Sequence, residues 1–143
     1  MPGDAERTLQ RIFHHLEPGG RAIIPLYIPP LSPDAENATD QWRIRERVRS
    51  SDGATLRVGE RFHFDSPRQM RVSTLRYEVI REGAIVQEVE RPWLRRWYSQ
   101  PQFRRLLHEA GFGSPRVLGE DGNPAHDDAP AFVFIASRPP VSA

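Results

Sequence analysis

The chain has 143 residues, 38% of them hydrophobic and 27% charged, a composition typical of a soluble globular protein of one domain. No apolar run approaches the about 20 residues that a membrane-spanning helix needs, and the polar start MPGDAERTLQ is unlike a signal peptide. The absence of cysteine excludes disulfides, thiolate zinc sites and a cysteine nucleophile. A net charge of +1 is too small for a general attraction to nucleic acid or to a membrane surface, so a cytoplasmic protein is expected.

All basic residues are arginine, and lysine is absent. Arginine binds phosphate and carboxylate groups in a planar, bidentate way, so the bias could indicate an anionic ligand. Genomic base composition is the alternative explanation. It is favoured because acidic residues are interleaved with the arginines along the chain.

The first predicted element is an amphipathic helix that Asp4 can cap. Its apolar residues recur at helical spacing and form one stripe: Leu9, Ile12, Phe13 and Leu16. Pro18 and the following pair Gly19-Gly20 end this helix. Residues 22–28 then form a strand that is apolar on both faces apart from Tyr27, which is typical of a parallel sheet covered on both sides.

The middle of the chain changes to strand periodicity. A Pro- and Asp-rich segment at 29–41 is predicted to be a loop, and its composition suits a mobile lid. Residues 42–93 then predict a meander of four antiparallel strands with one charged face, with tight turns at 52–53 and 82–83. The apolar positions change parity near Ser73-Thr74, which predicts a β-bulge there.

The last third returns to a helix followed by strands. Ser99 and Gln102 form a predicted capping box. A second apolar stripe follows at helical spacing: Phe103, Leu106, Leu107 and Ala110. Gly111 ends the helix. A short strand is predicted at 117–118 and a fully apolar one at 131–136.

Few residues offer recognisable chemistry. The pairs Gly19-Gly20 and Gly111-x-Gly113 follow helices, whereas a phosphate-binding loop follows a strand and precedes a helix, so both are interpreted as helix ends. The adjacent His14 and His15 point in different directions, and the cluster at 126–128 (His-Asp-Asp) is interpreted as a surface loop rather than a metal site. No metal ligand set and no hydrolase motif is predicted.

The segment RPWLRRWY at 91–98 interleaves aromatic and arginine side chains. Such a pattern can stack bases or bind an anionic ligand. The alternative is that Trp93 and Trp97 fill the junction between the meander and the next helix while the arginines stay solvated. The second interpretation is favoured, although the segment holds the best candidates for lining a pocket.

Three segments together resemble one family. They are LQRIFHHLEPGGRAIIPLYIP, RWYSQPQFRRLLHEAGFGSPRVLG and FVFIASRP. In this order and spacing they resemble the C-terminal half of a class I S-adenosylmethionine-dependent methyltransferase, as the crossover into the fifth strand, the helix before the sixth strand and the closing antiparallel strand. The resemblance implies an α/β fold: a partial Rossmann-like sheet with flanking helices and an inserted antiparallel meander (42–93), all in one domain of residues 1–143.

The resemblance implies S-adenosylmethionine as cofactor and a small molecule as substrate. The family's cofactor-binding strand and Gly-x-Gly loop have no counterpart in this sequence, so no catalytic or cofactor-binding residue is assigned. Ligands of α/β sheets bind beyond the carboxyl ends of the strands, and an insert of this kind roofs the site in relatives that carry one. The expected substrate-lining residues are therefore Tyr27, Trp93, Arg96 and Tyr98, with Arg96 contacting an anionic or polar group.

Two hypotheses about function follow. The first is a methyltransferase segment that is incomplete or inactive alone and acts with an N-terminal half supplied by another chain or an upstream reading frame. The second is a non-catalytic α+β module that binds a ligand or forms a homodimer through an exposed strand edge. Nucleic acid and membranes are not expected partners, and whether the chain is an enzyme stays open.

Overall fold

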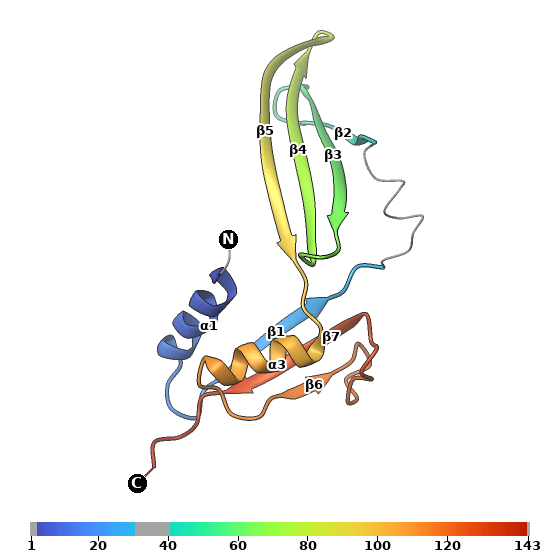
Figure 1. Cartoon of the computed structure of the whole chain (residues 1–143). Coiled ribbons are helices and arrows are strands. Elements are labelled where there is room, and N and C mark those ends of the chain that lie inside the picture. The colour runs from blue at the N-terminus through green and yellow to red at the C-terminus, as the bar shows by residue number, and fades with distance from the viewer. Residues whose placement is uncertain (1–2, 31–40, 143) are drawn as a thin grey trace. The chain divides into compact units, whose positions relative to one another are not determined.

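A computed structural model describes residues 3–30 and 41–142. The chain divides into two compact units (Figure 1). Unit 1 combines residues 1–29 with residues 97–143, and unit 2 is the continuous segment 30–96. Most of the predicted lid, residues 31–40, lies outside the described residues. No described helix is long and apolar enough to cross a bilayer.

Unit 1 is built on a sheet of three strands. They are β1 (Arg21–Tyr27), β7 (Ala131–Ser137) and β6 (Arg116–Leu118), in the order β1-β7-β6. The central strand β7 is antiparallel to both neighbours. β1 and β6 therefore run in the same direction on either side of it. This arrangement agrees with the predicted role of β7 as a closing antiparallel strand.

Both helices of unit 1 contribute to one core on one face of this sheet. α1 (Asp4–His15) supplies Leu9, and α3 (Gln100–Glu109) supplies Phe103 and Leu107. The sheet contributes alternate residues of β7, and all of these side chains are at most 4% exposed: Phe132, Phe134 and Ala136. The apolar stripes predicted for the two helices are thus confirmed as the surfaces that pack on the sheet.

The helix ends follow the sequence signals with one exception. The capping box of α3 is confirmed: Ser99 Oγ accepts from the Gln102 amide, and the Gln102 side chain accepts from the Ser99 amide. Gly111 follows the helix with φ +100°, a left-handed conformation. The prediction that Asp4 caps α1 is wrong, because Gly3 takes the cap position and Asp4 is the first helical residue, paired with Arg7.

The outer face of the three-stranded sheet differs from the prediction. β1 alternates in exposure rather than being covered on both sides, and Ile23 is 71% and Tyr27 56% exposed. The alternation arises because the described helices cover only the face that carries Ala22, Ile24 and Leu26. Within the described residues, β1 also pairs along one edge only, with β7.

Unit 2 is a meander of four antiparallel strands, as predicted. The strands are β2 (Arg43–Val48), β3 (Thr55–Asp65), β4 (Met70–Arg81) and β5 (Ala84–Arg96), in that order. The turns are confirmed, because Gly53 has φ +69° and both Glu82 and Gly83 have positive φ. The last strand continues to Arg96, beyond the expected end of the meander at Trp93.

The β-bulge predicted at Ser73-Thr74 is wrong. β3 and β4 pair without interruption across these residues, and the register shifts between Val79 and Ile80, where β4 meets β5. Apolar residues change parity along β4 because both faces of the sheet are partly apolar. Val72 lies on one face and Leu75 on the other, with no extra residue between them.

Cross-strand charge pairs cover much of unit 2. On one face, Arg57 bonds to Glu46 at 2.7 Å and to Glu78 at 3.4 Å, and Arg76 bonds to Glu90 at 2.8 Å. The carboxylates hold the pKa of Arg57 and of Arg76 above the ordinary value. The face opposite also carries arginines, so the prediction of a single charged face is too simple.

Candidate functional site

The four residues predicted to line a substrate pocket are divided between the two units. Tyr27 is the last residue of β1, and its side chain belongs to the exposed outer face of the unit 1 sheet. Tyr98 precedes α3 and packs beside the unit 1 core, with its ring centroid 5.8 Å from that of Phe103. Part of the Tyr98 ring therefore serves packing within unit 1.

Trp93 and Arg96 lie on β5, the edge strand of unit 2. They are three residues apart, so their side chains leave opposite faces of the sheet. Trp93 is 46% exposed, and the guanidinium carbon of Arg95 lies 4.0 Å from the centroid of its ring. The arginine that accompanies Trp93 in the structure is thus Arg95. If the alternation of side chains along this strand is extended to residue 96, the sequence places Arg95 on the same face as Trp93.

A cluster of side chains from neighbouring strands surrounds Trp93. Trp93 is opposite Ser73, which is opposite Phe62, and the next row of the sheet pairs Arg71 with Arg95. These residues share one face with Glu60, and we call the six residues the Glu60 cluster. It consists of residues from three adjacent strands: Glu60, Phe62, Arg71, Ser73, Trp93 and Arg95.

The Glu60 carboxylate organises the cluster. Its Oε1 accepts a hydrogen bond from Arg71 Nη2 at 2.8 Å and one from Ser73 Oγ at 2.9 Å, and Arg95 Nη2 lies 3.6 Å away. Ser73 is 1% exposed, so this acceptor satisfies a buried hydroxyl. The Arg71 guanidinium carbon also lies 3.7 Å from the Phe62 ring centroid. The side chains are therefore held by several partners each.

Chemically, this cluster offers an aromatic surface beside a fixed cation. One carboxylate faces two guanidinium groups, so the group carries a local excess of positive charge. Arg95 Nε is buried without a hydrogen-bond partner among the described residues. The arrangement can hold a polar or anionic group against an aromatic ring. Its one hydroxyl, Ser73, is 1% exposed and donates to Glu60, so the cluster is suited to binding rather than to nucleophilic chemistry.

Neither metal nor cofactor chemistry finds a ready site in the described residues. Within the ranges 3–30 and 41–142, no group of three or more His, Asp or Glu side chains could hold a metal ion. The loop at His126 is instead tied to α3, since Gln100 Nε2 donates to the His126 carbonyl oxygen at 2.7 Å.

The glycine turns do not fit S-adenosylmethionine. Gly19 and Gly111 have positive φ and follow the ends of α1 and α3. They therefore stand beside helix C-termini, where carbonyl groups are exposed, and not beside the amide-rich N-termini that bind anionic groups.

Comparison with solved structures identifies the fold. The chain superposes on an S-adenosylmethionine-dependent methyltransferase from Clostridium acetobutylicum with a TM-score of 0.65, at 10% identity, over 94% of this chain and 50% of that one. The fold is a methyltransferase fold. No protein-family model matches the sequence, and comparison with curated proteins finds no match either.

Two further neighbours are described as sugar-modifying methyltransferases. The sugar N-methyltransferase KedS8 of a Streptoalloteichus species has a TM-score of 0.57 at 20% identity, with 91% of this chain and 47% of that one covered. CalS10 of Micromonospora echinaspora, an amino pentose methyltransferase solved with S-adenosylmethionine bound, has a TM-score of 0.54 at 15% identity, with 93% and 50% covered. The chain thus spans about half the length of these methyltransferases.

Proposed function

We propose that this chain is the substrate-side, C-terminal part of an S-adenosylmethionine-dependent methyltransferase that acts on a small molecule. The observation that carries the proposal is the likeness in fold, which extends over nearly the whole chain but over about half of each methyltransferase. The sheet order β1-β7-β6 supports it, since it fits the last three strands of that family's sheet.

The cofactor-binding part would come from a separate segment. The exposed outer face of β1 supports this, and so does its second edge, which pairs with no strand among the described residues, because such an edge is suited to continue a larger sheet. In unit 2, Trp93 is proposed to contact the substrate together with Arg95, which stacks on its ring. Arg96, on the opposite face of β5, and Tyr27 and Tyr98, in unit 1, stay separate predictions of substrate contact. Their work would be to hold and orient the acceptor rather than to take part in the chemistry.

Titration calorimetry with S-adenosylmethionine tests whether the cofactor-binding residues come from a segment other than this chain. The chain of residues 1–143 alone should show no binding in the micromolar range. The same chain joined to the reading frame upstream of its Met1 codon should bind, if that frame encodes a strand followed by a Gly-x-Gly loop. The proposal would be contradicted by micromolar binding to the chain alone. It would also be contradicted if the upstream frame encodes no such segment and no partner chain restores binding.

Kinetics of the reconstituted enzyme tests the substrate-lining residues. Amino sugars are the first acceptors to assay, because two neighbours are described as methyltransferases of such compounds. Trp93→Ala is expected to raise the KM for the acceptor about tenfold while leaving S-adenosylmethionine affinity unchanged, because only acceptor contacts are lost. Trp42→Ala is the matched control, since Trp42 is stacked between Arg61 and Arg76 instead.

The second candidate function is a non-catalytic homodimer formed through β1. The specific observation in its favour is again the apolar outer face with Ile23 and Tyr27 exposed. Sedimentation of the chain alone distinguishes the two. A dimer in which the β1 amides exchange slowly with solvent would favour the module, whereas a monomer in which they exchange fast would favour a vacant docking edge.

A further inference from the structure

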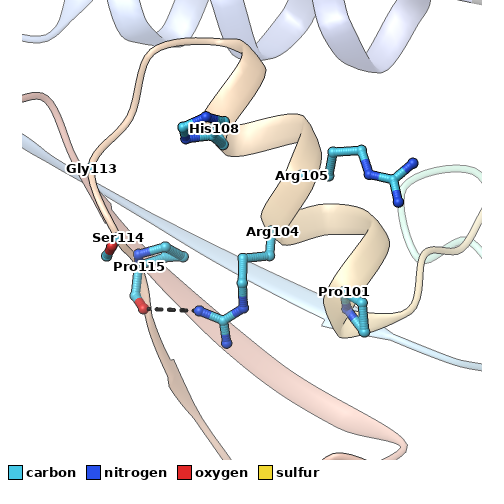
Figure 2. A pocket seen from close by; sticks show the side chains of 7 residues that line it. All are labelled: Pro101, Arg104, Arg105, His108, Gly113, Ser114 and Pro115. Carbon is cyan, nitrogen blue, oxygen red and sulfur yellow. Dashed lines mark hydrogen bonds between the residues drawn. The ribbon is translucent and has the colours of Figure 1, made fainter.

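A groove of 460 Å³ runs beside α3 in unit 1, and the proposed function makes no use of it (Figure 2). One wall is the exposed side of the helix, and the other is the turn at 113–115 that leads into β6. Its volume is in the range of about 300–1,000 Å³ that small-molecule sites occupy. The lining residues are Pro101, Arg104, Arg105, His108, Gly113, Ser114 and Pro115.

The lining is basic and contains no acid. Arg104 and His108 are four residues apart on the helix, so they lie on the same side, and Figure 2 shows both on the side that faces residues 113–115. Arg105 extends from the other side of the helix and belongs to the rim. Glu109, the next residue after His108, does not line the groove.

The basic side chains of the lining have no acidic partner in the part of the chain that the structure describes. Neither Arg104, Arg105 nor His108 forms an ion pair there. The arginines of the Glu60 cluster and of the charged face of unit 2 do form such pairs. The basic side chains of the groove are therefore available for an anion from outside the chain.

Arg104 is also held in place. Its Nη1 donates to the Pro115 carbonyl oxygen at 3.4 Å, and its guanidinium carbon lies 5.9 Å from the Phe134 ring centroid. Phe134 is fully buried. The guanidinium group is thus positioned across the groove, while most of its N–H donors remain available. The exposed Ser114 beside Pro115 adds a hydroxyl that can donate to an oxyanion.

We propose that this groove binds the phosphate group of a phosphorylated small molecule. Arg104 would supply the paired, planar donors that suit phosphate oxygens, with His108 and Ser114 as further donors and Arg105 adding charge at the rim. The small net charge and the limited volume favour a small phosphate ester over a polyanion. This site is independent of the methyltransferase proposal, because it lies on α3 and not at the proposed substrate-lining residues.

NMR titration of the chain with inorganic phosphate in a chloride buffer tests the site. The amide signals of Gly113 and Ser114 and the side-chain Nε–H signal of Arg104 are expected to shift to saturation at millimolar phosphate. Sodium chloride at matched ionic strength should leave them unchanged. A sugar phosphate should bind at least as tightly, whereas short DNA should show no preference for the groove.

Three variants make the result decisive. Arg104→Gln is expected to weaken phosphate binding about tenfold, the loss expected for one charge-assisted hydrogen bond. His108→Ala removes the ring N–H donor and is expected to weaken binding several-fold; His108 is exposed, so this variant keeps the fold even if Arg104→Gln does not. Arg11→Gln, which makes the same charge change as Arg104→Gln on an exposed site of α1, should bind normally. The proposal is overturned if phosphate and chloride act alike, or if Arg104→Gln and His108→Ala both bind as the unaltered chain does.

Discussion

Single residues determine how the helices and strands of unit 1 are connected, and Gly111 is the clearest example. It has φ +100°, and a Cβ there would lie 3.2 Å from Cζ of Phe13, whose ring packs edge to face against Phe112. A side chain at this position would therefore meet both backbone strain and a packed ring.

Gly111→Ala is expected to lower the free energy of unfolding by about 2 kcal/mol, the upper end of what the left-handed conformation alone costs, because the contact with Phe13 adds to the strain. Gly122→Ala is the control, since Gly122 has φ +78° but nothing within 4 Å of a Cβ. Urea denaturation measures the loss of unfolding free energy in both variants, and the difference between the two losses gives the cost of the contact with Phe13. Equal losses in the two variants would show that the ring moves aside without cost.

A carboxylate in the first hairpin of unit 2 gives stability that depends on pH. Arg49 hydrogen-bonds to Asp52, and Arg81 does so as well, and these bonds hold the pKa of Asp52 well below its ordinary value. Because the folded state prefers the ionised form, this stabilisation is complete above the unfolded pKa of about 4. It is lost as the pH falls below that value.

Asp52→Asn should therefore lower the urea midpoint of unit 2 at pH 7 and have a smaller effect at pH 2.5, where part of the stabilisation is already lost. Tryptophan fluorescence follows the transition. Glu82→Gln, in the turn at 82–83, removes a carboxylate that belongs to none of the ion pairs of the described residues, and it serves as the control. A difference between Asp52→Asn and the unaltered chain that stays constant with pH would contradict the linkage.

At the scale of elements, the start of α3 depends on its capping box. Ser99→Ala removes the acceptor of the Gln102 amide and should cost about 1 kcal/mol of stability. Ser99→Asp retains a capping oxygen and should stay within a few tenths of a kcal/mol of the unaltered chain. Thermal unfolding by circular dichroism measures both. If alanine and aspartate have the same effect, the cap contributes little.

Most signals that act over a few residues predict the structure correctly, the Asp4 cap being an exception, whereas a signal that depends on the partner strand does not. The stripe of α1, the Ser99 cap and the turn at Gly83 are local, so spacing and residue type suffice to predict them. The predicted bulge near Ser73 is misplaced because a change in the alternation of apolar residues has two possible causes. It can arise from a slipped register or from a sheet with apolar residues on both faces. Pro92 continues β5 because that strand is an edge, where a missing N–H costs no ladder bond.

The candidate site shows the same limit. The pattern of residues 91–98 predicts Trp93 as a pocket residue, but the pairing of Trp93 with Arg95 depends on the extension of β5 to residue 96. The groove residues Arg104 and His108 share one side of α3, a spacing that carries no signal of a site by itself. Their significance depends on the turn at 113–115, which the chain folds beside them.

At the scale of the whole molecule, the buried core of unit 1 is built, as far as the described residues go, from unit 1 itself. Every member of the buried cluster lies outside residues 30–96. Replacing 30–96 by a flexible Gly/Ser linker is therefore expected to leave unit 1 folded. Slow amide exchange in β7, the central strand, provides the measurement. Full exchange of β7 within the dead time would show that unit 1 needs the meander.

The positions of the tryptophans give the molecule an optical label for each unit. Trp97 is 6% exposed in unit 1, whereas Trp42 and the half-exposed Trp93 belong to unit 2. Indole emission shifts to the red as solvent reaches the ring, so Trp97 should emit at shorter wavelength than Trp93. A chain that keeps only Trp97 would report the unfolding of unit 1 in a spectrum free of unit 2. A chain that keeps only Trp93 would reveal a ligand that covers the indole through quenching or a blue shift.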